Sequence, residues 1–214
     1  MLYAYFIARA GPQIENLLYR TLHEAPVQFV HERDLVAAVR LLGAGKRSTP
    51  QLMLEHGAVL ATAWRRATVL PLRFGTSFRT EAAVGHLLAA RGAELAAALE
   101  RLDGKAEMGV RLRLAEDQNA QLRAADIAEL ARPLDSRMEV RAEPSGGRIL
   151  ELAHLIDRRE AAEYRERMAR QAIEVLGPRP PFHFLPQFLR IPVRAELRAQ
   201  GAPRRAGAPA GGTG

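Results

Sequence analysis

The chain has 214 residues, a formal net charge of +7, a sequence pI of about 10.6 and no cysteine. With 48% hydrophobic and 26% charged residues the composition is that of a globular protein, and the length fits one large domain or two small ones. The absence of cysteine excludes disulfide frameworks, thiolate metal sites and thiol nucleophiles.

The positive charge is unevenly distributed along the chain. Residues 1–114 and 177–214 are net basic, residues 115–176 are net acidic, and neither basic segment contains a run of like charge. The charge therefore does not by itself indicate a nucleic-acid partner. No stretch reaches the roughly 18–20 apolar residues that span a bilayer. Because the N-terminus also lacks the basic region of a signal peptide, we expect a cytoplasmic protein without a membrane partner.

The first half of the chain alternates strands and helices. Strands are predicted at residues 2–8, at 26–42 as a hairpin, and at 67–74, with a short helix at 14–23. Thr49 followed by Pro50 is a typical helix start, and the apolar face of that helix is predicted to carry Met53, His56, Leu60 and Trp64. A second helix is predicted to run without interruption from the N-cap Thr80 through Leu102.

The second half begins with a strictly alternating strand at residues 105–114. One face carries Ala106, Met108, Val110, Leu112 and Leu114, and the other carries Lys105, Glu107, Arg111 and Arg113. The remaining elements are predicted as a helix at 119–131, strands at 138–142 and 148–156, a helix at 158–176 and an extended segment at 177–185. Continuous hydrophobicity places strand 148–156 in the middle of the sheet.

This β-α-β-β-α-β order is that of a ferredoxin-like unit, in which both helices cover one face of an antiparallel sheet. The sequence therefore predicts an α+β protein with an N-terminal domain at 1–103 and a ferredoxin-like domain at 104–187. Residues 188–214 are basic and of low complexity, and we expect a disordered tail there. The polar face of strand 105–114 must meet solvent, the first domain or a partner.

Motifs for catalysis, metals and nucleotides are weak. The GAGKRS segment at 43–48 has Arg47 where a phosphate-binding loop needs serine or threonine. None of the six histidines forms a helical metal pair, and no serine lies in a G-x-S-x-G elbow. We expect no catalytic residues, no metal and no cofactor.

Two segments are unusual. In VLPLRFGTSF, at 69–78, Arg73 stands among apolar residues, and we expect Glu107 to be its ionic partner. In GPRPPFHF, at 177–184, the prolines favour an extended path that places Phe182 and Phe184 on the same side.

Taken in order, V-L-P-L-R-F-G-T at 69–76, G-K-x-E-x-G-V at 104–110 and G-P-x-P-P-F-x-F at 177–184 resemble the gas vesicle protein F/L family (GvpF/GvpL). The segment LIDRREAAEY at 155–164 is also similar to that family. The residues that carry the family motifs are Leu70, Pro71, Arg73, Phe74, Gly75, Thr76, Glu107, Gly177, Pro178, Pro180, Pro181, Phe182 and Phe184. The sequence does not separate the F type from the L type.

The resemblance implies a non-enzymatic accessory protein of gas vesicle formation with two α+β domains, the second ferredoxin-like. It also implies cytoplasmic association with gas vesicles and partners among the hydrophobic shell protein and other accessory proteins. We expect this protein to bind the shell protein and to assist nucleation or assembly of the vesicle wall. The candidate surface is the polar sheet face at Lys105, Arg111 and Arg113, with the edge near Phe182 and Phe184.

Two other classes of function stay open at this point. A ferredoxin-like regulatory module would bind a small ligand and show a ligand-dependent melting shift. A nucleic-acid-binding protein would use its arginines and show salt-dependent binding.

Overall fold

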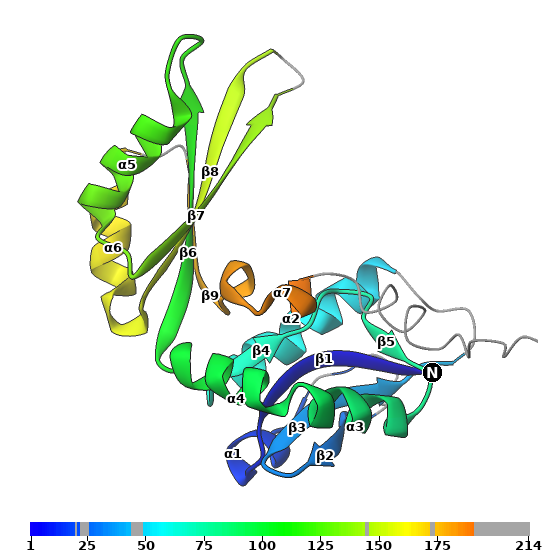
Figure 1. The fold of residues 1–214 in the computed structure, drawn as a ribbon. Coiled ribbons are helices and arrows are strands. Elements are labelled where there is room, and N and C mark those ends of the chain that lie inside the picture. Colours follow the sequence, from blue (N-terminus) through cyan, green and yellow to red (C-terminus); the bar gives the residue numbers. More distant parts are fainter. Residues whose placement is uncertain (20, 22–25, 44–48, 144–145, 172–173, 191–214) are drawn as a thin grey trace, which may run out of the picture.

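The computed structural model describes residues 1–19, 21, 26–43, 49–143, 146–171 and 174–190. Within these residues the chain forms two antiparallel sheets that stand at an angle to each other (Figure 1). The first sheet has the strand order β2-β3-β1-β4, with the short β5 also paired to β1, and the second has the order β7-β8-β6-β9. The predicted α+β class is confirmed.

In the first unit, residues 2–101, the described residues form five strands and four helices. These elements are β1 (Leu2–Arg9), α1 (Pro12–Glu15), β2 (Gln28–Glu32), β3 (Leu35–Leu41), α2 (Pro50–Trp64), β4 (Val69–Pro71), β5 (Ser77–Phe78), α3 (Glu81–Ala90) and α4 (Gly92–Arg101). The predicted start of α2 is confirmed, because the Thr49 hydroxyl accepts a hydrogen bond from the Leu52 N–H at 3.1 Å. His56, Leu60 and Trp64 are buried as predicted, whereas Met53 is 58% exposed.

The prediction of one long helix from Thr80 through Leu102 is wrong. Arg91 leaves the helical conformation, with φ −116° and ψ 14°, and Gly92 begins α4 after a bend of 72°. Glycine is a poor helix former, so the break falls where the helix is weakest. Among the described residues no single helix is long and apolar enough to cross a membrane.

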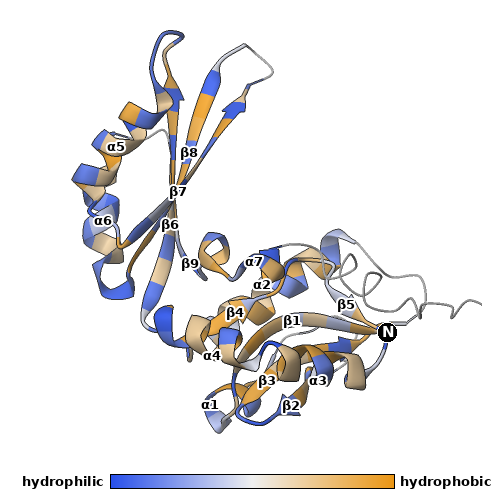
Figure 2. Ribbon diagram, viewed as in Figure 1, coloured by the Kyte–Doolittle hydropathy of each residue, from blue (hydrophilic) through white to orange (hydrophobic). Residues whose placement is uncertain are grey.

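Both faces of the first sheet are covered. A register shift in β1 between Ala4 and Phe6 turns Tyr3, Tyr5 and Phe6 toward α2. The other face packs against α3 and α4, which contribute Val84, Leu88, Leu95 and Leu99. Figure 2 shows how strongly apolar β1 and β3 are between these two layers.

The second unit, residues 105–179, has the predicted ferredoxin-like order. Its elements are β6 (Lys105–Leu114), α5 (Ala120–Ala131), β7 (Asp135–Ala142), β8 (Arg148–Asp157), the 3-10 turn η2 (Arg158–Glu160), α6 (Ala161–Met168) and β9 (Glu174–Arg179). As predicted, β8 lies between two other strands. The helix predicted at 158–176 ends at Met168 instead, because β9 already pairs with β6 at Glu174.

A closing segment at residues 182–190 packs between the two units (Figure 1). It consists of the 3-10 turn η3 (Phe182–Phe184) and the short helix α7 (Gln187–Arg190). Phe188 and Leu189, expected in the tail, are instead buried with residues of both sheets. Residues 191–214 lie outside the described residues.

Candidate functional site

The loop that follows β4 carries the first family motif and is held by a buried hydrogen-bond chain. The Gly75 N–H donates to the Tyr3 hydroxyl at 3.4 Å, and the hydroxyl lies 2.8 Å from Nδ1 of His56. His56 Nε2 lies 3.1 Å from the carbonyl oxygen of Leu72. All three contacts are satisfied when Tyr3 donates to Nδ1 and Nε2–H donates to Leu72. Burial lowers the pKa of His56 to about 4, which keeps the ring neutral as this chain requires.

A second buried polar group lies beside this chain. Arg40 Nε is 2.9 Å from the carboxylate of Glu55 and 3.1 Å from the Tyr5 hydroxyl, which in turn donates to Glu55. Burial raises the pKa of the Tyr5 hydroxyl above its ordinary value, so it stays a donor. Our sequence reasoning missed Tyr3, Tyr5, Arg40 and Glu55. The pair of tyrosines two residues apart on a buried strand was the available signal.

The expected ion pair between Arg73 and Glu107 is wrong. The Arg73 side chain is exposed and donates from Nη1 to the carbonyl oxygen of Arg190 at 2.7 Å. Because solvent hydrates this guanidinium, no buried carboxylate is needed. The rest of the motif is structural: Leu70, Pro71 and Thr76 are buried, and Phe74 lies edge-on to the rings of Tyr3 and His56.

Glu107 has different partners, all near the third family motif. Its carboxylate is fully buried and accepts hydrogen bonds from Arg179 Nε, the His183 backbone N–H and His183 Nδ1, each at 2.8 Å. Burial alone would raise the pKa of Glu107, but the hydrogen bonds from His183 and the charge of Arg179 hold it below its ordinary value. The carboxylate therefore ties β6 to β9 and to the closing segment.

Gly177 permits β9 to approach β6 closely. Its φ is +107°, and a Cβ at this position would lie 2.6 Å from the Glu107 carbonyl oxygen and 2.9 Å from Met108 Sδ. A side chain is excluded at this point of the G-P-x-P-P-F-x-F motif. Pro178 is exposed beside it, whereas Pro180 and Pro181 are buried.

The predicted extended path at 177–185 ends at Arg179, where β9 ends. Phe182 and Phe184 belong to a 3-10 turn; Phe182 is half-buried and Phe184 is 2% exposed. Phe184 packs with Leu155 and with apolar residues of the first unit. The proposed edge near these phenylalanines is therefore unavailable to a partner at Phe184.

The three family motifs meet where the two units join. Arg73 of the first motif holds the end of α7, Glu107 of the second holds η3, and Arg101 donates to the Phe184 carbonyl oxygen of the third. A further contact across this joint between the units is made by Arg158. Its guanidinium lies 3.9 Å from the centre of the Trp64 ring and donates a hydrogen bond to the backbone carbonyl oxygen of Trp64. These residues fix the orientation of the second sheet relative to the first.

The face of the second sheet opposite α5 and α6 is built from three rows of side chains that run across the strands. Nearest the joint is the clamp row, Arg179, Glu107, Leu155 and Asp135. Next is the small-residue row, Leu176, Gly109, Ala153 and Arg137. Beyond it is the charged row, Glu174, Arg111, Glu151 and Glu139.

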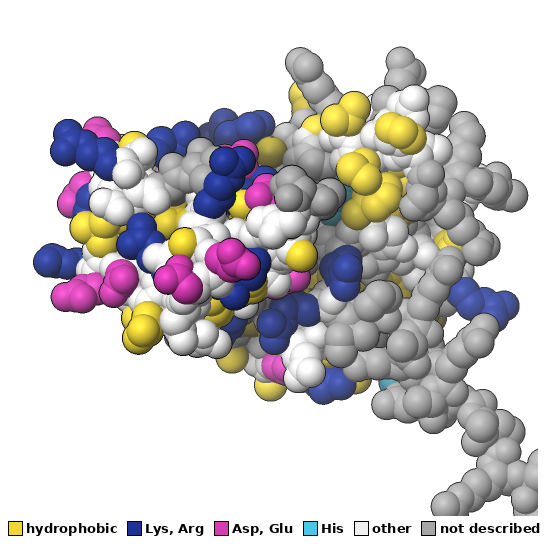
Figure 3. Space-filling model, turned by 90° about the horizontal axis from the view of Figure 1, so that it is seen from above, with side chains coloured by type: hydrophobic (Ala, Val, Ile, Leu, Met, Phe, Trp, Pro, Cys, Tyr) yellow, Lys and Arg dark blue, Asp and Glu magenta, His cyan; other side chains and the backbone are white. Residues whose placement is uncertain are grey.

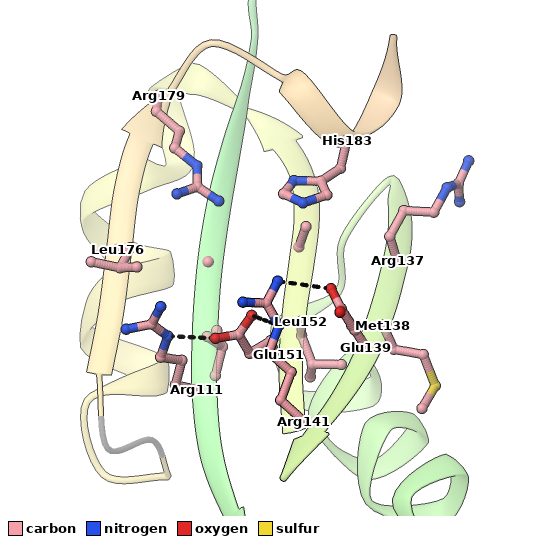
Figure 4. Close-up of a pocket in the computed structure, with 13 residues that line it drawn as sticks. Arg111, Arg137, Met138, Glu139, Arg141, Glu151, Leu152, Leu176, Arg179 and His183 are labelled. Carbon is pink, nitrogen blue, oxygen red and sulfur yellow. Dashed lines mark hydrogen bonds and ion pairs between the residues drawn. The ribbon is translucent and has the colours of Figure 1, made fainter. Parts of the chain in front are cut away.

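A hollow of about 270 Å³ lies over the small-residue row (Figure 4). Gly109 and Ala153 form its floor because they place almost no side chain there. Arg179 and His183 border it toward the joint, and Arg111, Arg141 and Glu151 border it on the opposite side. The hollow thus has a floor of small residues and a charged rim.

The rim is balanced in charge. Arg111 pairs with Glu151 at 2.9 Å and with Glu174 at 2.8 Å. Glu139 and Glu151 face each other across two strands, and Arg141 bridges them at 3.0 and 3.2 Å. Figure 3 shows the same mixture of positive and negative side chains across this unit.

Of the predicted partner surface, Arg111 and Arg113 are exposed on this open face, while Lys105 lies at the joint end and pairs with Asp157 at 3.3 Å. In the part of the chain that the structure describes, no group of three histidine or acidic side chains could hold a metal ion. The GAGKRS segment falls at residues 44–48, outside the described residues, apart from Gly43.

Comparisons with known proteins agree with the resemblance in the sequence. A family model described as gas vesicle synthesis protein GvpL/GvpF matches residues 1–136. The crystal structure of the gas vesicle protein GvpF from Anabaena sp. PCC7120 superposes with a TM-score of 0.69 at 17% identity, covering 86% of this chain and 94% of that chain. That of GvpF from Microcystis aeruginosa gives 0.69 at 15% identity, covering 86% and 98%. No curated protein sequence matches significantly.

At such low identity the two crystal structures establish the fold, while the family model establishes the relationship, since it spans more than half of the chain. The matched region contains the first motif, Glu107 and the candidate residues Arg111 and Arg113. The motif at 177–184 lies beyond the matched region. The chain therefore belongs to the GvpL/GvpF family of gas vesicle synthesis proteins.

Proposed function

We propose that this protein assists nucleation or assembly of the gas vesicle wall by binding the hydrophobic shell protein, in the cytoplasm and in association with the vesicles. The family match over residues 1–136 carries the gas vesicle role. A subunit that assembles through strands and apolar surfaces tends to aggregate before it reaches the wall. A protein that holds such a subunit needs a binding surface and no catalysis.

The open face of the second sheet is the surface we assign to this binding. It is the uncovered side of a sheet whose other face packs on α5 and α6, and the joint holds it rigidly in place. Its hollow of about 270 Å³ has room for an apolar side chain, and its rim presents both signs of charge. The chemistry fits a segment of the shell protein in which an apolar side chain is flanked by charged residues.

The charged rim contributes more to the specificity of shell-protein binding than to its affinity. Exposed ion pairs contribute only about 0–1 kcal/mol each, because solvent screens them. Arg111, Arg141 and their carboxylate partners can exchange those contacts for charges of a partner at little cost. Apolar contact within the hollow then adds to the affinity, and the charges select the register of the bound segment.

Co-purification with the shell protein tests this assignment. Arg111→Glu/Arg113→Glu places extra negative charge on the rim beside Glu151 and Glu174, and we expect binding to be lost. The matched control is Arg65→Glu/Arg66→Glu, which reverses two exposed arginines after α2 and should bind normally. Arg111→Gln/Arg113→Gln provides a milder variant if the reversal unfolds the sheet. Full retention of the shell protein by folded reversal variants would exclude this surface.

A further inference from the structure

The edge strand β7 is the most exposed part of the second sheet. Among the described residues its only strand partner is β8, and residues 137–142 are all exposed. Met138 and Val140, which point to the helix side, are 41% and 42% exposed. A free edge that carries apolar side chains is a template for pairing with another strand.

Charges on the other side of β7 alternate in sign. They are Asp135, Arg137, Glu139 and Arg141, each two residues from the next. This pattern disfavours several pairings with an identical strand, because like charges directly opposite each other are destabilising. A parallel, in-register pair sets every charge against its own kind. An antiparallel pair centred on Glu139 sets Arg137 against Arg141 and Glu139 against itself.

An antiparallel pair centred on Met138 has the opposite result. Asp135 of one copy lies opposite Arg141 of the other, and Arg137 lies opposite Glu139. On the helix side Met138 meets its own counterpart, and Val140 lies opposite Ser136. A shift of the pairing by one residue would place charged residues of one strand directly opposite Met138 and Val140 of the other, on the same face of the sheet. A pair centred on Val140 also places Glu139 opposite Arg141, but it leaves Asp135, Ser136 and Arg137 without partners in β7.

We propose that this protein forms a two-fold dimer in which β7 pairs antiparallel with β7 of a second copy, centred on Met138. The backbone groups of two free edges then satisfy each other, and the exposed Met138 side chains are covered. The pairs Arg137–Asp135 at 2.6 Å and Arg141–Glu139 at 3.0 Å become part of a network that crosses the interface. The second sheet of one copy and the second sheet of the other then form one continuous sheet.

One consequence rests on the proposed function. Residues opposite each other in an antiparallel pair share a face, so both open faces and both hollows lie on the same side of the dimer. A wall built from many copies of one shell protein would then be bound at two points by one dimer, which increases avidity without new contacts.

Single cysteines test the register directly, because the natural chain has none. Met138→Cys places two thiols directly opposite each other, within the span that a disulfide bridges. We expect Met138→Cys to form a reductant-sensitive dimer several-fold faster than Val140→Cys. Leu54→Cys, exposed on α2, is the control for random collision and should react slowly. Faster reaction at Val140→Cys, or equal rates at all three positions, would overturn the proposal.

Sedimentation of charge variants tests the same dimer without cysteines. We expect Arg137→Glu to shift the protein toward monomer and Arg137→Glu/Glu139→Arg to restore the dimer, because the double exchange again places opposite charges across the interface. Arg79→Glu, an exposed reversal in the first unit, should leave the dimer intact. A natural chain that stays monomeric at every concentration, or shell protein that suppresses the Met138→Cys disulfide by occupying β7, would contradict the proposal. A monomeric natural chain leaves the assignment of the open face untouched, whereas shell protein on β7 would move its binding site toward that edge.

Discussion

At the scale of single residues, Glu107 shows how a charge inside an alternating strand can be structural. Alternation placed it correctly on the polar side of β6 together with Arg111 and Arg113. The pattern could not show that the closing segment covers that side at Glu107 alone, because the cover comes from residues more than seventy positions later. The prediction that Arg73 is buried with an ionic partner failed for a related reason. Its apolar neighbours in the sequence are buried, but its own side chain reaches solvent.

We predict that Glu107→Gln lowers the free energy of unfolding by about 2 kcal/mol, the usual range for hydrogen bonds to a charged group. The amide removes the charge that Arg179 neutralises and cannot accept all three donors. Arg73→Ala is the comparison and should cost less than about 1 kcal/mol, because that side chain is exposed. Denaturant unfolding measures both. Equal destabilisation by the two changes would contradict the assignment of partners.

A second prediction concerns acid. Burial lowers the pKa of both His56 and His154 from an ordinary 6.5 to about 4. Between pH 6.5 and about pH 4 the unfolded chain binds protons that the folded chain does not. The two histidines therefore cost no stability above pH 6.5, and the free energy of unfolding falls as the pH is lowered through this range. The expected slope is about 1.4 kcal/mol per pH unit for each histidine.

Urea unfolding across a series of pH values checks this slope. His154→Gln keeps a partner for the Tyr164 hydroxyl, now 2.7 Å from Nδ1, and should remove one histidine's share of the acid dependence. His86→Gln, an exposed position on α3, should leave the slope unchanged. Identical acid dependence in the natural chain and His154→Gln would exclude the buried histidine as its source.

At the scale of elements, local chemistry decided what the sequence could predict. The caps at Thr49 and Thr80, the strict alternation of β6 and the order of the second unit all follow from neighbours in the chain, and all are present. The break at Arg91, although it falls next to Gly92, and the early start of β9 also require contacts with distant parts of the chain. Both depend on where distant strands lie: α3 and α4 must bend to cover one sheet, and β9 must meet β6.

Two glycines give predictions of opposite sign. Gly177→Ala should lower stability by about 1–3 kcal/mol, because a Cβ would meet the backbone of β6 and φ is +107°. Gly57→Ala, inside α2 with open space around it, should raise stability by about 1 kcal/mol through helix propensity. Thermal unfolding of both variants decides the matter, and a stabilising Gly177→Ala would show that β9 does not approach β6 as described.

At the scale of the whole molecule, the family motifs have a common structural role, because their residues hold the joint between the two units. The motifs are far apart in sequence, yet Arg73, Glu107 and Phe184 all contact the closing segment or form part of it. Sequence reasoning could name these residues by resemblance and could predict the two sheets separately. It could not derive the angle between them, which depends on side-chain packing of Phe184, Phe188 and Arg158 across the joint.

The hollow could not be predicted from the sequence either, because it is formed by residues that are distant in the chain. Gly109 and Ala153 become neighbours only through the register of β6 with β8, and Arg179 and His183 border them only because β9 and η3 are tied to Glu107. Alternation in the sequence predicted that Arg111 and Arg113 lie on one face of β6, and both are exposed there. The carboxylates that balance these arginines come from β8 and β9, so the sequence of β6 alone could not place them on that face.

The most direct measurement is flotation of a gas-vesicle-producing strain in which the chromosomal gene is deleted and replaced by variants. The natural gene and Arg65→Glu/Arg66→Glu should restore floating cells. Arg111→Glu/Arg113→Glu, expressed at the same level and folded, should leave the cells sinking, because the open face no longer binds the shell protein. Cells that float normally with that variant would contradict the role assigned to the open face.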